Sequence, residues 1–374
     1  MAKVVNMPLL LAEMRKADLD VAVVASPQNF FYLSGWKIQT QVLIPDRLAV
    51  GIITADGETA LVVAKQEEGQ TKKYSWVKDV HAYAEFAESP MQRVAELLQE
   101  KGLARGRIGI EQRFISEHYF QDLGSRLPNA TLLHCDSAFD KARMVKTGPE
   151  IEALRLAARG TDEAINRALQ TAKSGDSEHK LARVMSDSLF EIGKGEFRDL
   201  TWGVATGPNI LITHYWAGNR KLASDEMVRV NVRATMHGYY SHLYRLAVVG
   251  HASERHRSWY EKARDVHYRA MERLRPGARV CDLYHAARKD IEAAGAAFKG
   301  SLCGHSTGIS LHENPRIQPL DETVLVPGMV IASEPLVVDP DYCHYHLEDL
   351  VLVTEKDPVR LSDRTNTDEL FVIQ

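Results

Sequence analysis

The feature that most constrains the fold of this chain is a short break at residues 146–150, Lys-Thr-Gly-Pro-Glu. Thr147 is a good helix N-cap residue, and Pro149 and Glu150 are both favoured in the first turn of a helix. A long helical pattern follows the break and continues to Gln170. We therefore predict that a new helix, and with it a new domain, begins at this point.

The segments on the two sides of the break differ in character, and 374 residues exceed the usual size of one domain. Before the break, short apolar runs alternate with amphipathic segments, which is typical of a mixed sheet covered by helices. After the break come helical patterns such as Glu178–Ile192, and after residue 200 the chain changes to short strand patterns such as Tyr239–Val249, which two further helical patterns interrupt. We predict an N-terminal α/β domain over residues 1–142 and a C-terminal α+β domain over residues 143–374, with helices packed on one side of an antiparallel sheet.

Composition excludes several classes of protein. The formal net charge of −4 gives no basic excess for binding nucleic acid. No run approaches the roughly 20 apolar residues that cross a bilayer, and the N-terminus lacks the apolar core of a signal peptide. The four cysteines are far apart and form no CxxC pair, which argues against a disulfide framework or a structural zinc site. We expect a cytoplasmic protein with neither nucleic-acid nor membrane partners.

Groups suited to acid-base or metal chemistry are concentrated in four segments. Each group alone has an ordinary structural explanation, because lone histidines and strand-end carboxylates are common in folded proteins. Chemistry becomes the better interpretation only because the segments form one ordered pattern. They are PNILITHY (208–215), NVRATMHGYYSHLYR (231–245), GHSTGISLHENPR (304–316), and the pairs Glu334-Pro335 and Glu348-Asp349.

The order and wording of these segments resemble the pita-bread family of creatinase, prolidase and aminopeptidase P. The segments NFFYLSG (29–35) and RMVKTGPE (143–150) are also similar to signatures of that family. The resemblance implies a C-terminal catalytic domain with the pita-bread fold. It also implies a homodimer in which the N-terminal domain completes the active site of the partner subunit.

The chain departs from the metallopeptidases of this family at two positions. In those enzymes two divalent ions are held by two aspartates, one histidine and two glutamates. The resemblance maps the histidine to His305 and the glutamates to Glu334 and Glu348, but the aspartate positions fall on Asn231 and His242. Two adjacent hard cations need several anionic oxygens. The sequence therefore argues against a dinuclear site.

Creatinase, a metal-free member of the family, shares the asparagine at position 231 and the GHS wording at 304–306. Its catalytic histidine corresponds to His214, and its two carboxylate-binding arginines correspond to Arg47 and Arg316. Tyr244 stands near the position of a glutamate that binds the guanidinium of creatine, so a less cationic substrate is expected.

The leading hypothesis is accordingly a creatinase-like hydrolase that cleaves a non-peptide C–N bond, of amidine, cyclic amide or ureide type, in a small carboxylate-bearing substrate. This hypothesis requires no metal ion and no other cofactor. It assigns catalysis to His214, His305, His312, Glu334 and Glu348, and substrate binding to Arg47, Arg316, His242, Tyr244 and Asn231.

Two alternatives stay open. One is a mononuclear metalloenzyme, a prolidase-type peptidase or a lyase, in which His242, His305, Glu334 and Glu348 bind one zinc or similar ion. His312 would then take part in proton transfer or oxyanion stabilisation. The other is a catalytically inactive binding module, against which the number of retained chemical groups argues.

Overall fold

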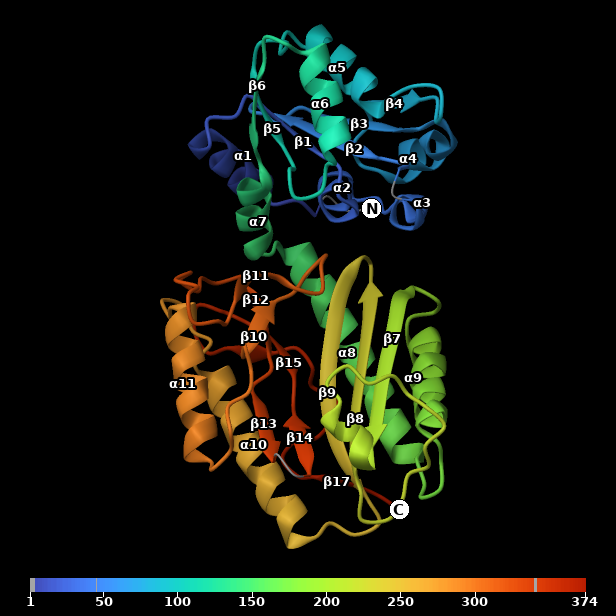
Figure 1. The fold of residues 1–374 in the computed structure, drawn as a ribbon, viewed down its shortest axis with the longest axis vertical. Coiled ribbons are helices and arrows are strands. Elements are labelled where there is room, and N and C mark those ends of the chain that lie inside the picture. Colours follow the sequence, from blue (N-terminus) through green and yellow to red (C-terminus); the bar gives the residue numbers. More distant parts are fainter. Residues whose placement is uncertain (1–3, 45, 340–341) are drawn as a thin grey trace. The chain divides into compact units, whose positions relative to one another are not determined.

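The computed structural model describes residues 4–44, 46–339 and 342–374, and the chain divides into two compact units, residues 1–143 and 144–374 (Figure 1). Each unit has its own sheets and its own buried apolar core. The first unit is α/β and the second is α+β, so the predicted fold class is confirmed.

The N-terminal unit is built on one six-stranded sheet with the order β4-β3-β2-β1-β5-β6. Strand β2 is antiparallel to both β1 and β3, and the remaining pairs are parallel. The elements are α1 Met7–Lys16, β1 Val21–Val24, α2 Pro27–Ser34, α3 Gln39–Leu43, β2 Val50–Thr54, β3 Thr59–Ala64, α4 Glu68–Tyr74, β4 Val80–Tyr83, α5 Pro90–Glu100, β5 Arg107–Ile110, α6 Glu117–Arg126, β6 Thr131–His134 and α7 Asp136–Met144.

The C-terminal unit combines a four-stranded sheet (β17-β9-β8-β7), a five-stranded sheet (β11-β10-β12-β15-β16) and the hairpin β13-β14. Helices α8 and α9 pack on the four-stranded sheet, and α10 and α11 bury apolar residues against strands of the hairpin and the five-stranded sheet (Figure 1). The elements are α8 Gly148–Thr171, α9 Glu178–Ile192, β7 Phe197–Thr206, β8 Met227–Met236, β9 Tyr239–Val249, α10 Glu254–Glu272, α11 Val280–Ala293, β10 Gly304–Ser306, β11 Glu313–Arg316, β12 Val330–Ser333, β13 Leu336–Asp339, β14 Cys343–His346, β15 Asp349–Leu352, β16 Val359–Arg360 and β17 Phe371–Ile373.

One backbone bridge brings two of the predicted site segments together. Tyr244 of β9 forms an isolated antiparallel bridge with Glu348, immediately before β15. The amide N–H of Glu348 donates to the carbonyl of Tyr244 at 3.3 Å. This contact joins the four-stranded sheet to the five-stranded sheet, and therefore joins the second sequence segment to the fourth.

Among the described residues, we find no helix that is both long enough and apolar enough to cross a lipid bilayer.

Candidate active site

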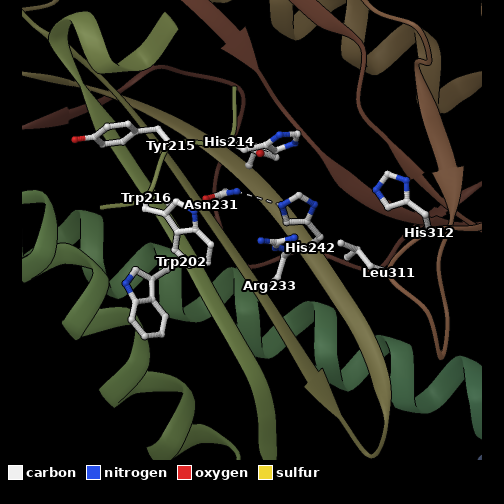
Figure 2. Close-up of a pocket in the computed structure, with 11 residues that line it drawn as sticks. Trp202, His214, Tyr215, Trp216, Asn231, Arg233, His242, Leu311 and His312 are labelled. Carbon is white, nitrogen blue, oxygen red and sulfur yellow. Dashed lines mark hydrogen bonds between the residues drawn. The ribbon is translucent and has the colours of Figure 1, made fainter. Parts of the chain in front are cut away.

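The β8–β9 hairpin carries a row of polar side chains on one face. Asn231 and Arg233 alternate along β8, and His242 and Tyr244 alternate along β9, so all four point to the same side of the sheet. Asn231 is paired in register with Tyr244, and Arg233 with His242. Nε2 of His242 lies 3.2 Å from the side-chain amide of Asn231 (Figure 2). The hairpin thus brings together three residues that the sequence predicted, and adds Arg233.

Three potential metal ligands meet beside this hairpin. His305 lies in β10, Glu334 follows β12 and Glu348 precedes β15. Each offers one ligand atom, and these atoms all lie within 4.8 Å of one another. Nε2 of His305 is 3.5 Å from Oε1 of Glu334, and Nδ1 of His242 is 3.2 Å from Oε2 of Glu348. The four residues of the mononuclear alternative therefore lie in one cluster.

Four polar atoms of this cluster lack hydrogen bonds within the described part of the chain. Glu348 is fully buried, and neither of its carboxylate oxygens accepts a hydrogen bond. Nε2 of His305 and Nδ1 of His242 are likewise buried without a hydrogen-bond partner, because the contact of His242 with Glu348 lacks hydrogen-bond geometry. Burial, and next the charge of Glu334, raise the pKa of Glu348 well above its usual value. Such a carboxylate is costly to ionise without a cation beside it.

These atoms fit one divalent ion. Nδ1 of His305 faces the carbonyl oxygen of Ser306 at 2.9 Å, and donating its proton there leaves the Nε2 lone pair for a metal. Glu334 and Glu348 complete a group of three mutually close donors, and His242, which contacts Glu348, would add a fourth to give an N₂O₂ set of the kind that binds zinc or a similar ion. A pair of adjacent ions does not fit, because Asn231 and His242 leave only two carboxylates in the cluster.

A further histidine, which the sequence analysis missed, joins the cluster. Nε2 of His346 lies 3.4 Å from Oε2 of Glu334, and its ring stacks on Tyr244 with centroids 4.0 Å apart. Burial lowers the pKa of His346, although the adjacent Glu334 opposes this effect. The signal was its position two residues before Glu348, since alternate residues of an extended chain share a face.

His312 connects this cluster with the adjacent cavity. Its ring stacks on that of His305, with centroids 3.7 Å apart and planes 15° apart. Burial, and next the neighbouring His305, lower the pKa of His312 to about 4, so the ring is neutral near pH 7. The loop that carries it is held from the domain boundary, where Nζ of the buried Lys146 donates to Oγ of Ser306 at 2.7 Å and to Oε2 of Glu313 at 3.2 Å.

A cavity of about 220 Å³ lies over the face of the hairpin (Figure 2). His214, a predicted catalytic residue, reaches it from an exposed loop. Glu178 holds this loop by accepting hydrogen bonds from the amides of Thr206 and Gly218. The cavity is lined by Trp202, Gly203, His214, Tyr215, Trp216, Asn231, Arg233, His242, Tyr244, Leu311 and His312.

The two arginines predicted to bind a substrate carboxylate lie elsewhere. Arg316 does not line this cavity; it is exposed on β11, an edge strand of the five-stranded sheet. Arg47 belongs to the N-terminal unit, where Glu85 accepts two hydrogen bonds from its guanidinium, at 2.6 and 2.8 Å. Within the C-terminal unit, the arginine that lines the cavity is Arg233.

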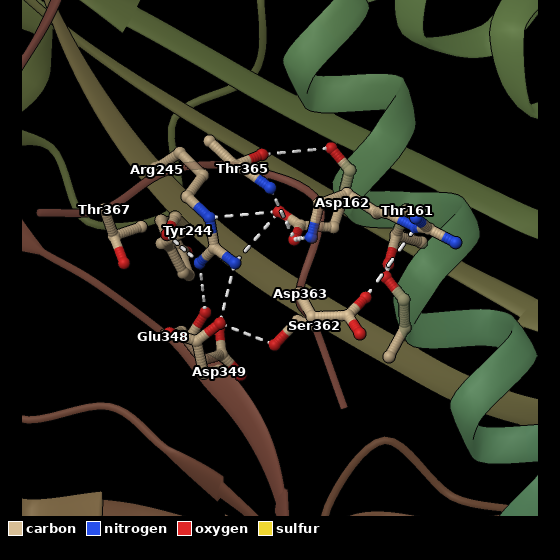
Figure 3. A network of polar contacts seen from close by, with 12 residues as sticks. Thr161, Asp162, Tyr244, Arg245, Glu348, Asp349, Ser362, Asp363, Thr365 and Thr367 are labelled. Carbon is tan, nitrogen blue, oxygen red and sulfur yellow. Dashed lines mark hydrogen bonds and ion pairs between the residues drawn. The ribbon is translucent and has the colours of Figure 1, made fainter. Parts of the chain in front are cut away.

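A buried ionic network centred on Arg245 lies next to the cluster (Figure 3). The guanidinium of Arg245 bonds Asp162 at 2.9 Å and Asp349 at 2.6 Å, and it also donates to the carbonyl oxygens of Tyr244 and Glu348. Burial alone would raise the pKa of Asp349, but Arg245 holds it well below its usual range. The network therefore fixes both sides of the bridge between β9 and β15.

Comparison with known proteins places the chain among prolidase-like enzymes. Residues 152–355 match metallopeptidase family M24, and residues 8–145 match the creatinase/prolidase N-terminal domain. An Xaa-Pro dipeptidase of Pyrococcus furiosus is 28% identical over 94% of this chain and 96% of its own length. A creatinase of Bacillus sp. is 27% identical over 91% of this chain and 86% of its own. The solved prolidase from Pyrococcus furiosus aligns with a TM-score of 0.80 at 26% identity, covering 95% of this chain and all of that one. The predicted family resemblance is confirmed.

The leading hypothesis from the sequence is wrong. Xaa-Pro dipeptidases recur among the relatives and the structural neighbours, and such enzymes cleave a peptide bond rather than a non-peptide C–N bond. The hypothesis gave decisive weight to Asn231 and to the GHS wording, which the chain shares with creatinase, and to the pairing of Arg47 with Arg316. These comparisons support the prolidase-type alternative.

Proposed function

We propose that this chain, which belongs to metallopeptidase family M24, is a hydrolase that cleaves small peptides with one divalent metal ion per active site. The observation that carries the proposal is the fully buried Glu348 carboxylate, which accepts no hydrogen bond within the described residues and faces His305, Glu334 and His242. By analogy with the named relatives, the preferred substrates are Xaa-Pro dipeptides.

The residues of the cluster have separate roles in this proposal. His242, His305, Glu334 and Glu348 hold the ion, which when bound supplies a Lewis acid and lowers the pKa of a coordinated water. His312 is neutral near pH 7 and donates its ring N–H to the carbonyl oxygen of the scissile bond as negative charge develops there. Burial raises the pKa of Tyr244 to about 12, so its hydroxyl stays protonated and can donate a hydrogen bond to a substrate in the cavity.

His214 completes the arrangement on the solvent side of the cavity. It is exposed, it lines the cavity, and its loop is pinned by Glu178. We assign it the transfer of a proton to the leaving amine, which needs a group open to exchange with water.

The first test is metal content, measured by elemental mass spectrometry on protein purified without a chelator or a histidine tag. We expect about one ion per chain, loss of Xaa-Pro hydrolysis on chelation, and recovery when the ion is restored. His305→Ala should lose the metal, while His285→Ala, a change on the outer surface of α11, should retain it. Metal-free protein that hydrolyses peptides at an undiminished rate would contradict the proposal.

In the second test, carboxylates are introduced at the two residues that we expect to limit the site to one ion, Asn231 and His242. In the double variant Asn231→Asp/His242→Asp, carboxylates return to the two positions where the metallopeptidases of the family have aspartates. We expect the metal content of this variant to rise to about two ions per chain, because the added anionic oxygens neutralise a second cation. An unchanged content of one ion would show that these two residues do not limit the site.

The expected homodimer, with Arg47 reaching the site of the partner subunit, stays a prediction. Light scattering coupled to gel filtration, over a range of protein concentrations, tests the oligomeric state. A strictly monomeric mass with full activity would refute the shared site.

A further inference from the structure

Arg233 lines the cavity, and no carboxylate of the described chain forms an ion pair with it. It lies on β8 between Val232 and Ala234, both buried, and its own side chain is partly exposed into the cavity. No described carboxylate oxygen lies within ion-pair distance of its guanidinium, whereas Arg245 and Arg47 each have carboxylate partners. An arginine that is half-buried without an anion loses hydration with no compensation from a counter-charge.

The side chains that share the cavity with Arg233 are aromatic, imidazole, amide or apolar, and none of them is a carboxylate. His242 is its cross-strand partner, and His312 lines the same cavity (Figure 2). Among the residues that line the cavity, Arg233 is the one lysine or arginine.

We propose that Arg233 is the binding site for a carboxylate of the substrate, and that it selects small peptides that carry this anion. The planar guanidinium binds a carboxylate through two parallel, charge-assisted hydrogen bonds. The cavity of about 220 Å³ limits the ligand to a small molecule, and Leu311 and Trp216 offer apolar contact to its side chain. This inference rests on the proposed function for the reaction itself, but the binding of the anion does not depend on turnover.

The orientation of the bound substrate follows from the register of the hairpin. Arg233 lies directly across from His242, which touches Glu348 of the metal cluster. A carboxylate held at Arg233 therefore keeps the adjacent peptide bond beside the cluster and between His214 and His312. A substrate without the anion loses this positioning, so the loss should affect kcat as well as KM.

The test compares binding of matched acid and amide probes, N-acetyl-leucine and N-acetyl-leucinamide, by calorimetry on the metal-loaded protein. We expect wild-type protein to prefer the acid by roughly 10- to 100-fold, the range of a charge-assisted hydrogen-bonded pair. Arg233→Gln should remove this preference, and Arg233→Lys should keep part of it because the charge remains without the planar fork. Arg183→Gln, on the exposed face of α9, serves as the matched arginine control.

Three outcomes would overturn the inference: an acid preference that survives in Arg233→Gln, the absence of any acid preference in wild-type protein, or a preference lost in Arg316→Gln instead. Hydrolysis of Xaa-Pro dipeptides and of their C-terminal amides gives the second readout. A dipeptide with a free C-terminus and an amidated dipeptide with an acidic side chain distinguish the two sources of the carboxylate. If no peptide is hydrolysed while the probe pattern holds, the proposed function fails and the anion site stands.

Discussion

Replacing Glu150 by glutamine should make the stability of the protein less dependent on pH between about pH 4.5 and 7. Glu150 is the third residue of α8 and is almost fully buried. Oε2 accepts the backbone N–H of Thr147 at 2.8 Å, and Oε1 accepts the hydroxyl of Tyr239 at 3.1 Å. Burial raises its pKa from 4.5 to about 7, with Lys146 opposing and Glu313 reinforcing the shift.

The sign and the size follow from linkage between protonation and folding. Because the pKa is higher in the folded protein than in the unfolded chain, the folded state binds the proton more tightly, and unfolding releases it between these two values. The contribution of Glu150 is therefore fully present below pH 4.5 and is lost as the pH rises to about 7. A displacement of this size corresponds to roughly 3 kcal/mol, since one pH unit is about 1.36 kcal/mol.

Urea unfolding of wild-type protein and of Glu150→Gln at pH 5, 6, 7 and 8 measures the effect. Glutamine keeps a side-chain oxygen for the amide of Thr147, so the helix cap is retained. We expect the variant to gain stability relative to wild type as the pH rises, by up to about 3 kcal/mol, with a plateau above pH 7. A stability difference that is the same at every pH would refute the reasoning, because it would mean that Glu150 does not titrate differently on folding.

Two further predictions concern the packing behind the site. Gly203→Ala should lower kcat/KM by tenfold or more, about 1.4 kcal/mol, because the added Cβ would lie 2.2 Å from Oδ1 of Asn231. Steady-state kinetics with a peptide substrate measures this loss. Gly69→Ala is the control, because a Cβ added at Gly69 meets no atom within 4 Å. Arg245→Met should reduce the free energy of unfolding by about 3–5 kcal/mol, because it removes the cation that pairs with the buried Asp162 and one of the two arginines that pair with Asp349. Urea unfolding at pH 7 measures this loss, and a change below about 1 kcal/mol would contradict it.

The sequence predicted most of the fold because its patterns are local. The strand pattern at Tyr239–Val249 and the helical pattern at Glu178–Ile192 predict the same bounds that β9 and α9 have in the structure. The break at residues 146–150 is also local, since Thr147 forms the predicted cap with Glu150.

The composition of the site depends instead on which distant strands meet. His346 was missed because its contacts with Glu334 and Tyr244 depend on which distant strands meet, and its position two residues before Glu348 indicated only that the two residues share a face. Arg316, eleven residues beyond His305, was expected in the site because the resemblance maps it onto a carboxylate-binding arginine of creatinase. The two residues are indeed paired in register, but Arg316 is on an edge strand and its side chain is exposed.

Glu348 and Asp349 are adjacent acids in different environments: Glu348 lies among the candidate metal ligands and accepts no hydrogen bond from a described residue, whereas Asp349 is bound by Arg245, Arg360 and His267. Inserting or deleting one residue between β14 and β15 would exchange the faces on which these two acids lie. Asp349 would then face the candidate metal ligands, and Glu348 would face Arg245. Related sequences should therefore vary in length around this hairpin only on the β13–β14 side, and alignments that place a gap next to Glu348 can be rejected on physical grounds.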